Sequence, residues 1–181
     1  MKVFIPLANG FEEIEAIATI DVLKRANIEA VTFGLNSTSV TSARGLQIRT
    51  DKKIDDMGTD QIEREFNAMV LIGGNPGYLN LGRSQKVIDC IKKFNGSGKL
   101  IGAICAAPSV LNTAGILHDK AATIYPGMER EIPRPKGTKL VVDDNIVTAQ
   151  GPAVAIDFAL KLVEKLAGAG EANKVRKALV C

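Results

Sequence analysis

The sequence predicts a doubly wound α/β fold, in which a mostly parallel sheet carries helices on both faces. Three observations lead to this prediction. Short apolar runs without alternation recur along the chain, which is typical of strands buried on both faces. Segments with the 3.6-residue spacing of an amphipathic helix separate them. Many of the 17 glycines fall where one periodicity gives way to the other. The length of 181 residues predicts one domain, residues 1–181.

The first half of the chain alternates between strand and helix patterns. Strands are predicted at Lys2–Ala8, Ile28–Gly34, Val40–Thr50 and Ala68–Ile72. The third of these has Gly45 near its centre, which indicates a strand pair or a bulged extended segment. A helix from Phe11 places four apolar residues on one face, which we expect to point inward: Ile14, Ile17, Ala18 and Val22. Asp60–Glu65 predicts a short helix.

The second half repeats the alternation. Helices are predicted at Ser84–Phe94, with Ser84 as N-cap, at Ala107–Ala114, and from Pro152 onward. The helix from Pro152 directs five residues inward: Ile156, Ala159, Leu160, Val163 and Leu166. Glu171–Leu179 adds a last turn or two. Strands are predicted at Lys99–Ile104, Ala121–Ile124, Lys139–Val142 and Ile146–Ala149, the last two joined as a hairpin.

Composition and charge exclude several classes of function. A net charge of +3, evenly spread, and only 4% aromatic residues argue against a nucleic-acid or acidic-membrane partner. The sequence has no signal-peptide pattern and no apolar run long enough to span a membrane. Three cysteines without a CxxC motif predict reduced thiols and a cytoplasmic location, and a single histidine argues against a zinc site.

The junction Gly102–Pro108 is the strongest candidate for chemistry. It places Cys105 between an apolar strand and a helix whose first turn carries Pro108. Small neighbouring residues permit the sharp turn that exposes nucleophiles at the sheet edge in other α/β enzymes. The N–H groups at a helix N-terminus lower the pKa of a thiol, so we expect an activated Cys105. The alternative is that Cys105 is a small buried apolar residue.

Two further strand-to-helix junctions carry polar groups. Glu15 lies about one turn inside the first helix; in a dry crevice its carboxyl would stay protonated and could donate a hydrogen bond to a thiolate. Alternatively, the carboxylates near this helix start, including Glu12 and Glu13, simply face solvent. Gly73-Gly74 could leave a backbone N–H free for an oxyanion, or could form only a tight turn. His118 lies in a charged loop after Gly115, which argues against a Cys–His dyad.

These segments together resemble the ThiJ/PfpI superfamily, and within it the branch of the Parkinsonism-associated protein deglycase and its bacterial relatives. The resemblance rests on Phe11–Glu15, Gly73–Asn75, Ala103–Pro108 and Gly151-Pro152, and runs to about Leu166. It implies a flavodoxin-like fold, a homodimer, and no cofactor or metal.

The resemblance also implies roles for individual residues. Cys105 matches the oxidation-sensitive nucleophile, and Glu15 matches the protonated acid beside it. Gly74 and Ala106 match the backbone donors of the pocket. Arg25 and Arg44 match arginines near the site and the dimer contact, with an anion-binding or supporting role. Tyr125 stands where several members carry a histidine, and a tyrosine is a poor general base at neutral pH.

The resemblance implies three alternative functions from different classes. The first is a glutathione-independent glyoxalase or deglycase, in which the Cys105 thiolate attacks a 2-oxoaldehyde or its amine or thiol adducts, with a role in oxidative and carbonyl stress. The second is a redox-sensing, chaperone-like protein that uses Cys105 oxidation without turnover. The third is a protease or amidase, which the absence of a histidine near the elbow disfavours.

Overall fold

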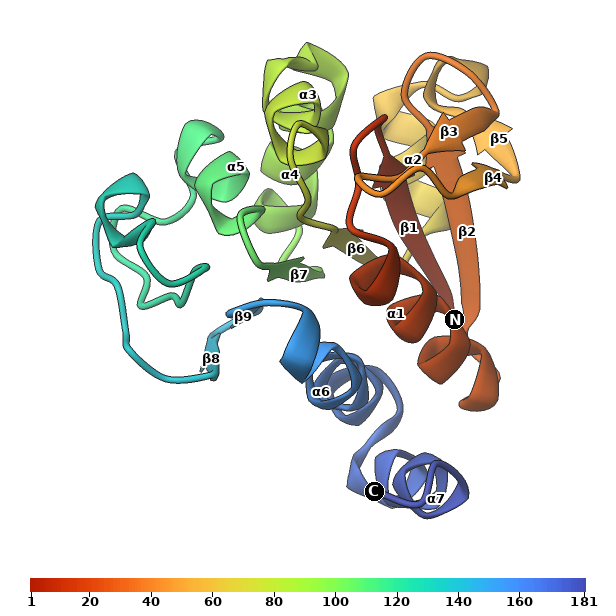
Figure 1. Ribbon diagram of the computed structural model, residues 1–181, viewed down its shortest axis with the longest axis vertical. Helices are drawn as coiled ribbons and strands as arrows, with labels where there is room; N and C mark the ends of the chain where they lie inside the picture. Colours follow the sequence, from red (N-terminus) through yellow and green to blue (C-terminus); the bar gives the residue numbers. More distant parts are fainter.

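A computed structural model describing residues 1–181 contains a seven-stranded sheet in the order β5-β2-β1-β6-β7-β9-β8 (Figure 1). The strands are β1 (Lys2–Leu7), β2 (Glu29–Gly34), β5 (Lys52–Lys53), β6 (Ala68–Leu71), β7 (Leu100–Ile104), β8 (Leu140–Asp143) and β9 (Ile146–Ala149). Every neighbouring pair is parallel except β8 and β9. The predicted doubly wound α/β class is therefore confirmed.

Helices cover both faces of the sheet, as Figure 1 shows. One face carries α1 (Glu13–Arg25), α6 (Ala155–Ala167) and α7 (Ala169–Ala178). The other carries α2 (Thr59–Glu65), α3 (Gly77–Arg83), α4 (Gln85–Gly96) and α5 (Pro108–Thr113). Each face has its own core of 28 buried residues. The central strand β1 contributes alternate residues to the two cores, which is why its sequence is apolar almost throughout.

The inner face of α1 differs from the prediction. Ile14 and Ile17 are 57% and 45% exposed, whereas Glu15 and Thr19 are completely buried. The apolar spacing identified the helix but not its orientation. The helix is turned so that a carboxyl group enters the interior, which no rule of apolar burial predicts. Ile156 at the start of α6 is likewise 42% exposed and not inward, although Ala159, Leu160 and Val163 are buried as expected.

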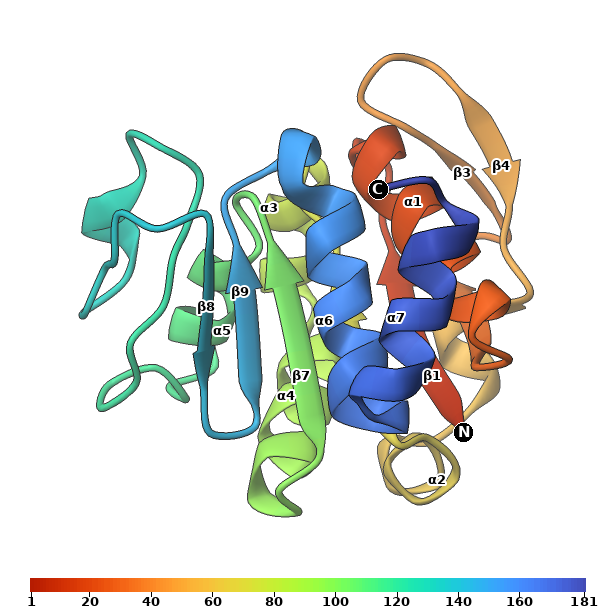
Figure 2. The same ribbon diagram turned by 90° about the horizontal axis from the view of Figure 1, so that it is seen from below.

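Other elements show where local patterns succeed. The segment around Gly45 is a strand pair, β3 (Ser39–Thr41) and β4 (Gln47–Arg49), as one of the two readings predicted. The β8–β9 hairpin and the Ser84 cap, which accepts from the Val87 N–H, are confirmed. The C-terminal turns form a full helix, α7, which packs on α6 (Figure 2). No helix is both long and apolar enough to cross a bilayer.

One predicted strand is absent, and one helix was not predicted. Ala121–Ile124 is not a strand: only an isolated bridge joins Ala122 to Pro135, and the Thr123 N–H donates to the Thr148 hydroxyl instead of to a strand backbone. The helix α3 was not predicted, because its sequence begins and nearly ends with glycine. It closes over the edge of the sheet where the candidate residues lie.

Candidate active site

The site begins at the turn that follows β7. Cys105 adopts a left-handed backbone conformation, with φ 63°, which is uncommon for a residue with a side chain. Two hydrogen bonds hold this turn: the Cys105 N–H donates to the Ala149 carbonyl, and the Tyr125 N–H donates to the Cys105 carbonyl, each at 2.9 Å. The surrounding loops therefore impose the strained geometry, and the expected sharp turn is present.

Glu15 approaches this turn from α1. Its side chain is completely buried, and its Oε2 accepts a hydrogen bond from the Gly73 N–H at 2.9 Å. Oε1 is buried without a hydrogen-bond partner, and the carboxyl group and the Cys105 thiol influence each other's pKa. A Cβ atom added at Gly73 would lie 2.6 Å from the Cys105 Cβ and 3.0 Å from Glu15 Oε2. Gly73 is therefore required because the acid and the thiol meet across its backbone.

Burial dominates the electrostatics of the pair. It raises the pKa of Glu15 to about 7, partly offset by the Gly73 N–H. Burial and the neighbouring Glu15 carboxylate also raise the pKa of the Cys105 thiol to about 12, while the Ala106 and Gly74 N–H groups lower it by less. This direction is opposite to the lowering expected from a helix N-terminus alone. The Glu15 carboxylate is one cause of the raised Cys105 pKa, so protonation of Glu15 lowers that pKa and favours the thiolate.

Cys105 opens into a cavity of about 600 Å³. The walls come from six loops or helix ends, and they are lined by Glu12, Ala43, Arg44, Gly74, Asn75, Tyr78, Cys105, Ala106, Tyr125, Met128 and Pro152. Such a volume lies within the range of small-molecule sites. No group of three or more potential metal-ligating side chains occurs in the chain.

The structure brings most of the candidate residues together. Glu15, Gly74, Cys105 and Ala106 meet at the base of the cavity, and Arg44 and Tyr125 lie on its wall. Arg25 does not join them: it lies in the last turn of α1 and pairs with Asp21 at 2.6 Å. His118 is exposed in its loop, as expected, and lies on a different part of the surface.

Sequence reasoning missed Glu12 as a member of the site. This residue is only 5% exposed, caps α1 by accepting from the Glu15 N–H at 2.7 Å, and lines the cavity. Its position before the helix could have suggested a cap, but three nearby carboxylates made a solvent-facing cluster the simpler interpretation. Tyr78 from α3 and Met128 were also missed, because α3 and the loop around Met128 carry no clear pattern.

Comparison with known proteins decides the family. The sequence profile of the DJ-1/PfpI family matches residues 1–165. The chain belongs to the DJ-1/PfpI family. The family match spans the elbow with Cys105, the start of α1 with Glu15 and the Gly73-Gly74 turn.

Individual members of the family are similar over nearly their whole length. The chain is 37% identical to Protein dj-1beta of Drosophila melanogaster, covering 96% of this chain and 94% of that protein. It is 32% identical to a Caenorhabditis elegans protein named glutathione-independent glyoxalase DJR-1.2, covering 93% and 89%. The solved structure of oxidized Toxoplasma gondii DJ-1 superposes with a TM-score of 0.93 at 36% identity, covering 99% and 97%.

Proposed function

We propose that this protein is a glutathione-independent glyoxalase that converts 2-oxoaldehydes into 2-hydroxy acids, with Cys105 as nucleophile and Glu15 as proton donor and acceptor. The observation that carries the proposal is a thiol held at a strained turn, at the base of a 600 Å³ cavity, beside a buried carboxyl group with a pKa of about 7. A general acid–base group is most effective when its pKa lies near the working pH. The glyoxalase name of the Caenorhabditis elegans relative supports the same activity.

The reaction needs no external oxidant. The Cys105 sulfur adds to the aldehyde carbon, and the carbonyl oxygen takes a proton to give a hemithioacetal. The hydrogen on that carbon then leaves as a proton while the adjacent ketone oxygen takes one, which gives an enediol. A proton adds to the former ketone carbon and the hemithioacetal hydroxyl loses its proton, so that one carbon is oxidised as its neighbour is reduced. Water cleaves the resulting 2-hydroxyacyl thioester and returns the thiol. In this scheme Glu15 moves the protons, and the Gly74 and Ala106 N–H groups stabilise negative charge at the base of the cavity.

The size of the cavity supports a wider substrate range than a free aldehyde. Its volume of about 600 Å³ is that of a site for a drug-sized ligand, and methylglyoxal has five heavy atoms. The apolar and aromatic wall formed by Tyr78, Tyr125 and Met128 leaves room for the rest of an amine or thiol adduct. We therefore include deglycation of such adducts in the proposal. The reaction requires a reduced thiol, which agrees with the cytoplasmic location expected from the sequence.

Lactate production from methylglyoxal by the purified protein tests the proposal. We expect wild type to form lactate, Cys105→Ser to form none, and Cys181→Ser, which alters the exposed C-terminal cysteine, to match wild type. Lactate formation at the same rate in Cys105→Ser would exclude Cys105 as nucleophile. A wild type that consumes no methylglyoxal while its Cys105 oxidises readily would favour the redox-sensing alternative, which uses the same thiol.

We also propose that the chain forms a homodimer through the outer face of α1. Ile14 and Ile17 are 57% and 45% exposed, which leaves two large apolar side chains one turn apart on that face. Sedimentation velocity at micromolar concentration should show a dimer, and Ile17→Lys should shift it toward monomer. A monomeric wild type would contradict this part of the proposal.

A further inference from the structure

The start of α1 carries a second carboxylate that lies within the site. The Glu12 Oε2 accepts a hydrogen bond from the Glu15 N–H at 2.7 Å, and the Glu12 N–H donates to the Gly73 carbonyl at 3.0 Å. Glu12 is therefore hydrogen-bonded to the backbone of Glu15 and to Gly73, and the Gly73 N–H in turn donates to the Glu15 carboxyl group. With 5% of its surface exposed, it has little water to screen its charge.

Arg44 is the only cationic residue that lines the cavity. Its Nη1 lies 3.6 Å from Glu12 Oε1 and 3.9 Å from Glu13 Oε2, and its side chain is 73% exposed. The two charged groups of this pair differ in burial: the Glu12 carboxylate is buried, whereas the Arg44 guanidinium is largely exposed in the single chain.

The loop that carries Arg44 is tied to the start of α1 at three points. The Ala43 N–H donates to the Phe11 carbonyl at 2.8 Å, and the Ser42 hydroxyl donates to Glu13 Oε1 at 3.1 Å. A parallel bridge joins Phe11 to Ser42. These contacts hold the β3–β4 connection beside the start of α1, and Arg44 on that connection lies 3.6 Å from Glu12 Oε1. Figure 1 shows the strands β3 and β4 that this connection joins.

We propose that Glu12 and Arg44 are positioning residues: the Glu12 carboxylate holds a proton on the Glu15–Cys105 pair, and Arg44 moderates that hold. The inference rests on the proposed roles of Cys105 and Glu15 and names two residues that control their protonation. A buried like charge disfavours a second negative charge nearby, so an ionised Glu12 opposes ionisation of the pair. The Arg44 guanidinium offsets this effect only in part, because it lies between Glu12 Oε1 at 3.6 Å and Glu13 Oε2 at 3.9 Å and is shared by the two carboxylates.

The ionisable groups around the pair are few. Glu12, Arg44, Tyr78 and Tyr125 line the cavity with Cys105, and Glu13 is the only other charged residue linked to Arg44. Burial is the main cause of the raised pKa of Glu15, and among these groups Glu12 is the one whose charge adds to it. Glu13 accepts a hydrogen bond from the Ser42 hydroxyl and does not line the cavity.

The pH profile of Cys105 alkylation measures the protonation of the pair. While the pair holds two protons, the thiolate fraction and the rate of reaction with iodoacetamide rise with pH. Once the first proton has left, the remaining proton is shared between sulfur and carboxyl, and the rate levels off. In wild type we expect this break near pH 7, where the pair loses its first proton.

Glu12→Gln keeps an oxygen that can cap α1 and removes the charge. We expect its break about one pH unit lower than in wild type, equivalent to a tenfold change in the proton affinity of the pair. Glu12→Asp retains both cap and charge and should restore the wild-type break. Arg44→Gln should move the break upward by a smaller amount, about twofold in proton affinity, and high salt should reduce this effect.

Asp21→Asn is the matched control, because it removes one carboxylate from the solvent face of the same helix, and its break should coincide with that of wild type. A Glu12→Gln break within about 0.2 pH units of wild type, a fifth of the expected effect, would overturn the inference. So would equal breaks in Glu12→Gln and Glu12→Asp, which would indicate a role in capping alone. If the wild-type rate instead rises without a break through pH 9, the proposed Glu15–Cys105 pairing itself fails, and lactate production tests the glyoxalase activity separately.

Discussion

Replacing Glu15 by Gln should remove a large pH dependence of stability. The Glu15 carboxyl is completely buried, and burial raises its pKa from 4.5 to about 7. The folded protein therefore binds a proton more tightly at this position than the unfolded chain does. The free energy of unfolding is highest below pH 4.5 and falls as the pH rises toward 7, with no further loss from this group above that value.

The size of the effect follows from the two pKa values. One pKa unit is worth about 1.36 kcal/mol, so the change from 4.5 to about 7 costs the folded state about 3 kcal/mol at pH 8. Gln is similar in shape to the protonated acid, and its carbonyl oxygen can accept the hydrogen bond from the Gly73 N–H. Glu15→Gln should thus be close to wild type in stability at pH 4.5 and more stable by about 3 kcal/mol at pH 8.

Urea unfolding of both proteins between pH 4.5 and 8.5, at one protein concentration, measures this difference. The diagnostic quantity is the slope of the difference with pH, because a constant offset from the added amide N–H groups does not affect it. The slope is read between pH 4.5 and 7.5, because the thiol of Cys105 titrates in the unfolded chain near pH 9 and contributes little below that limit. A difference that stays constant from pH 5 to pH 7.5 would refute the buried, protonated Glu15.

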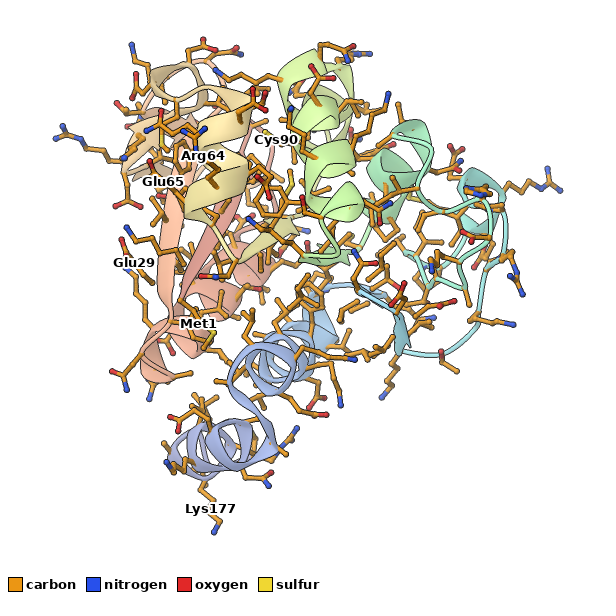
Figure 3. The ribbon with its side chains drawn as sticks, turned by 180° about the vertical axis from the view of Figure 1, so that it is seen from behind. Met1, Glu29, Arg64, Glu65, Cys90 and Lys177 are labelled. Atoms are coloured by element: carbon orange, nitrogen blue, oxygen red, sulfur yellow. The ribbon has the colours of Figure 1, made fainter.

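Three further predictions concern the rest of the site and its surroundings. Alkylation mapped by mass spectrometry should label Cys105 well before Cys90, because Cys105 opens into the cavity whereas Cys90 is completely buried on α4 (Figure 3). Access decides the order, since burial raises the pKa of both thiols to about 12. Faster labelling of Cys90 would contradict this reasoning. Gly73→Ala should lose lactate production and destabilise the fold by about 1–3 kcal/mol, since the new methyl group would lie 2.6 Å from the Cys105 Cβ; unchanged activity and melting temperature would show that the turn is free to move. His118→Ala should retain activity within a few-fold, because the side chain is exposed in a loop away from the cavity; a loss of about 10²–10⁴-fold would reveal a missed general base.

Local chemistry along the chain was sufficient to predict the sheet, most of the helices and the place of Cys105 at a strand-to-helix elbow, whereas the role expected of Glu15 came from the family resemblance. The apolar run of β6 and the amphipathic spacing of α4 predict burial directly. A strand between two helix layers needs apolar side chains on both faces, and a helix packed on a sheet needs them on one. The Cys105 elbow was predictable for a similar reason. A cysteine between a buried strand and a proline-initiated helix must lie at the carboxyl edge of the sheet, where ligands bind in this class of fold.

The tertiary structure decided everything that depends on long-range neighbours. Nothing in the local sequence shows that α1 turns Glu15 inward and Ile14 outward, since that orientation depends on the β6 and β7 turns that receive the carboxyl group. The prediction of a lowered Cys105 pKa was wrong for the same reason. A helix terminus is a local feature, whereas the burial and the Glu15 carboxylate that raise this pKa come from distant segments. Glu12 and Arg44 lie 32 residues apart in sequence, and only the β3–β4 connection folding over α1 makes them one charge pair at the wall of the cavity.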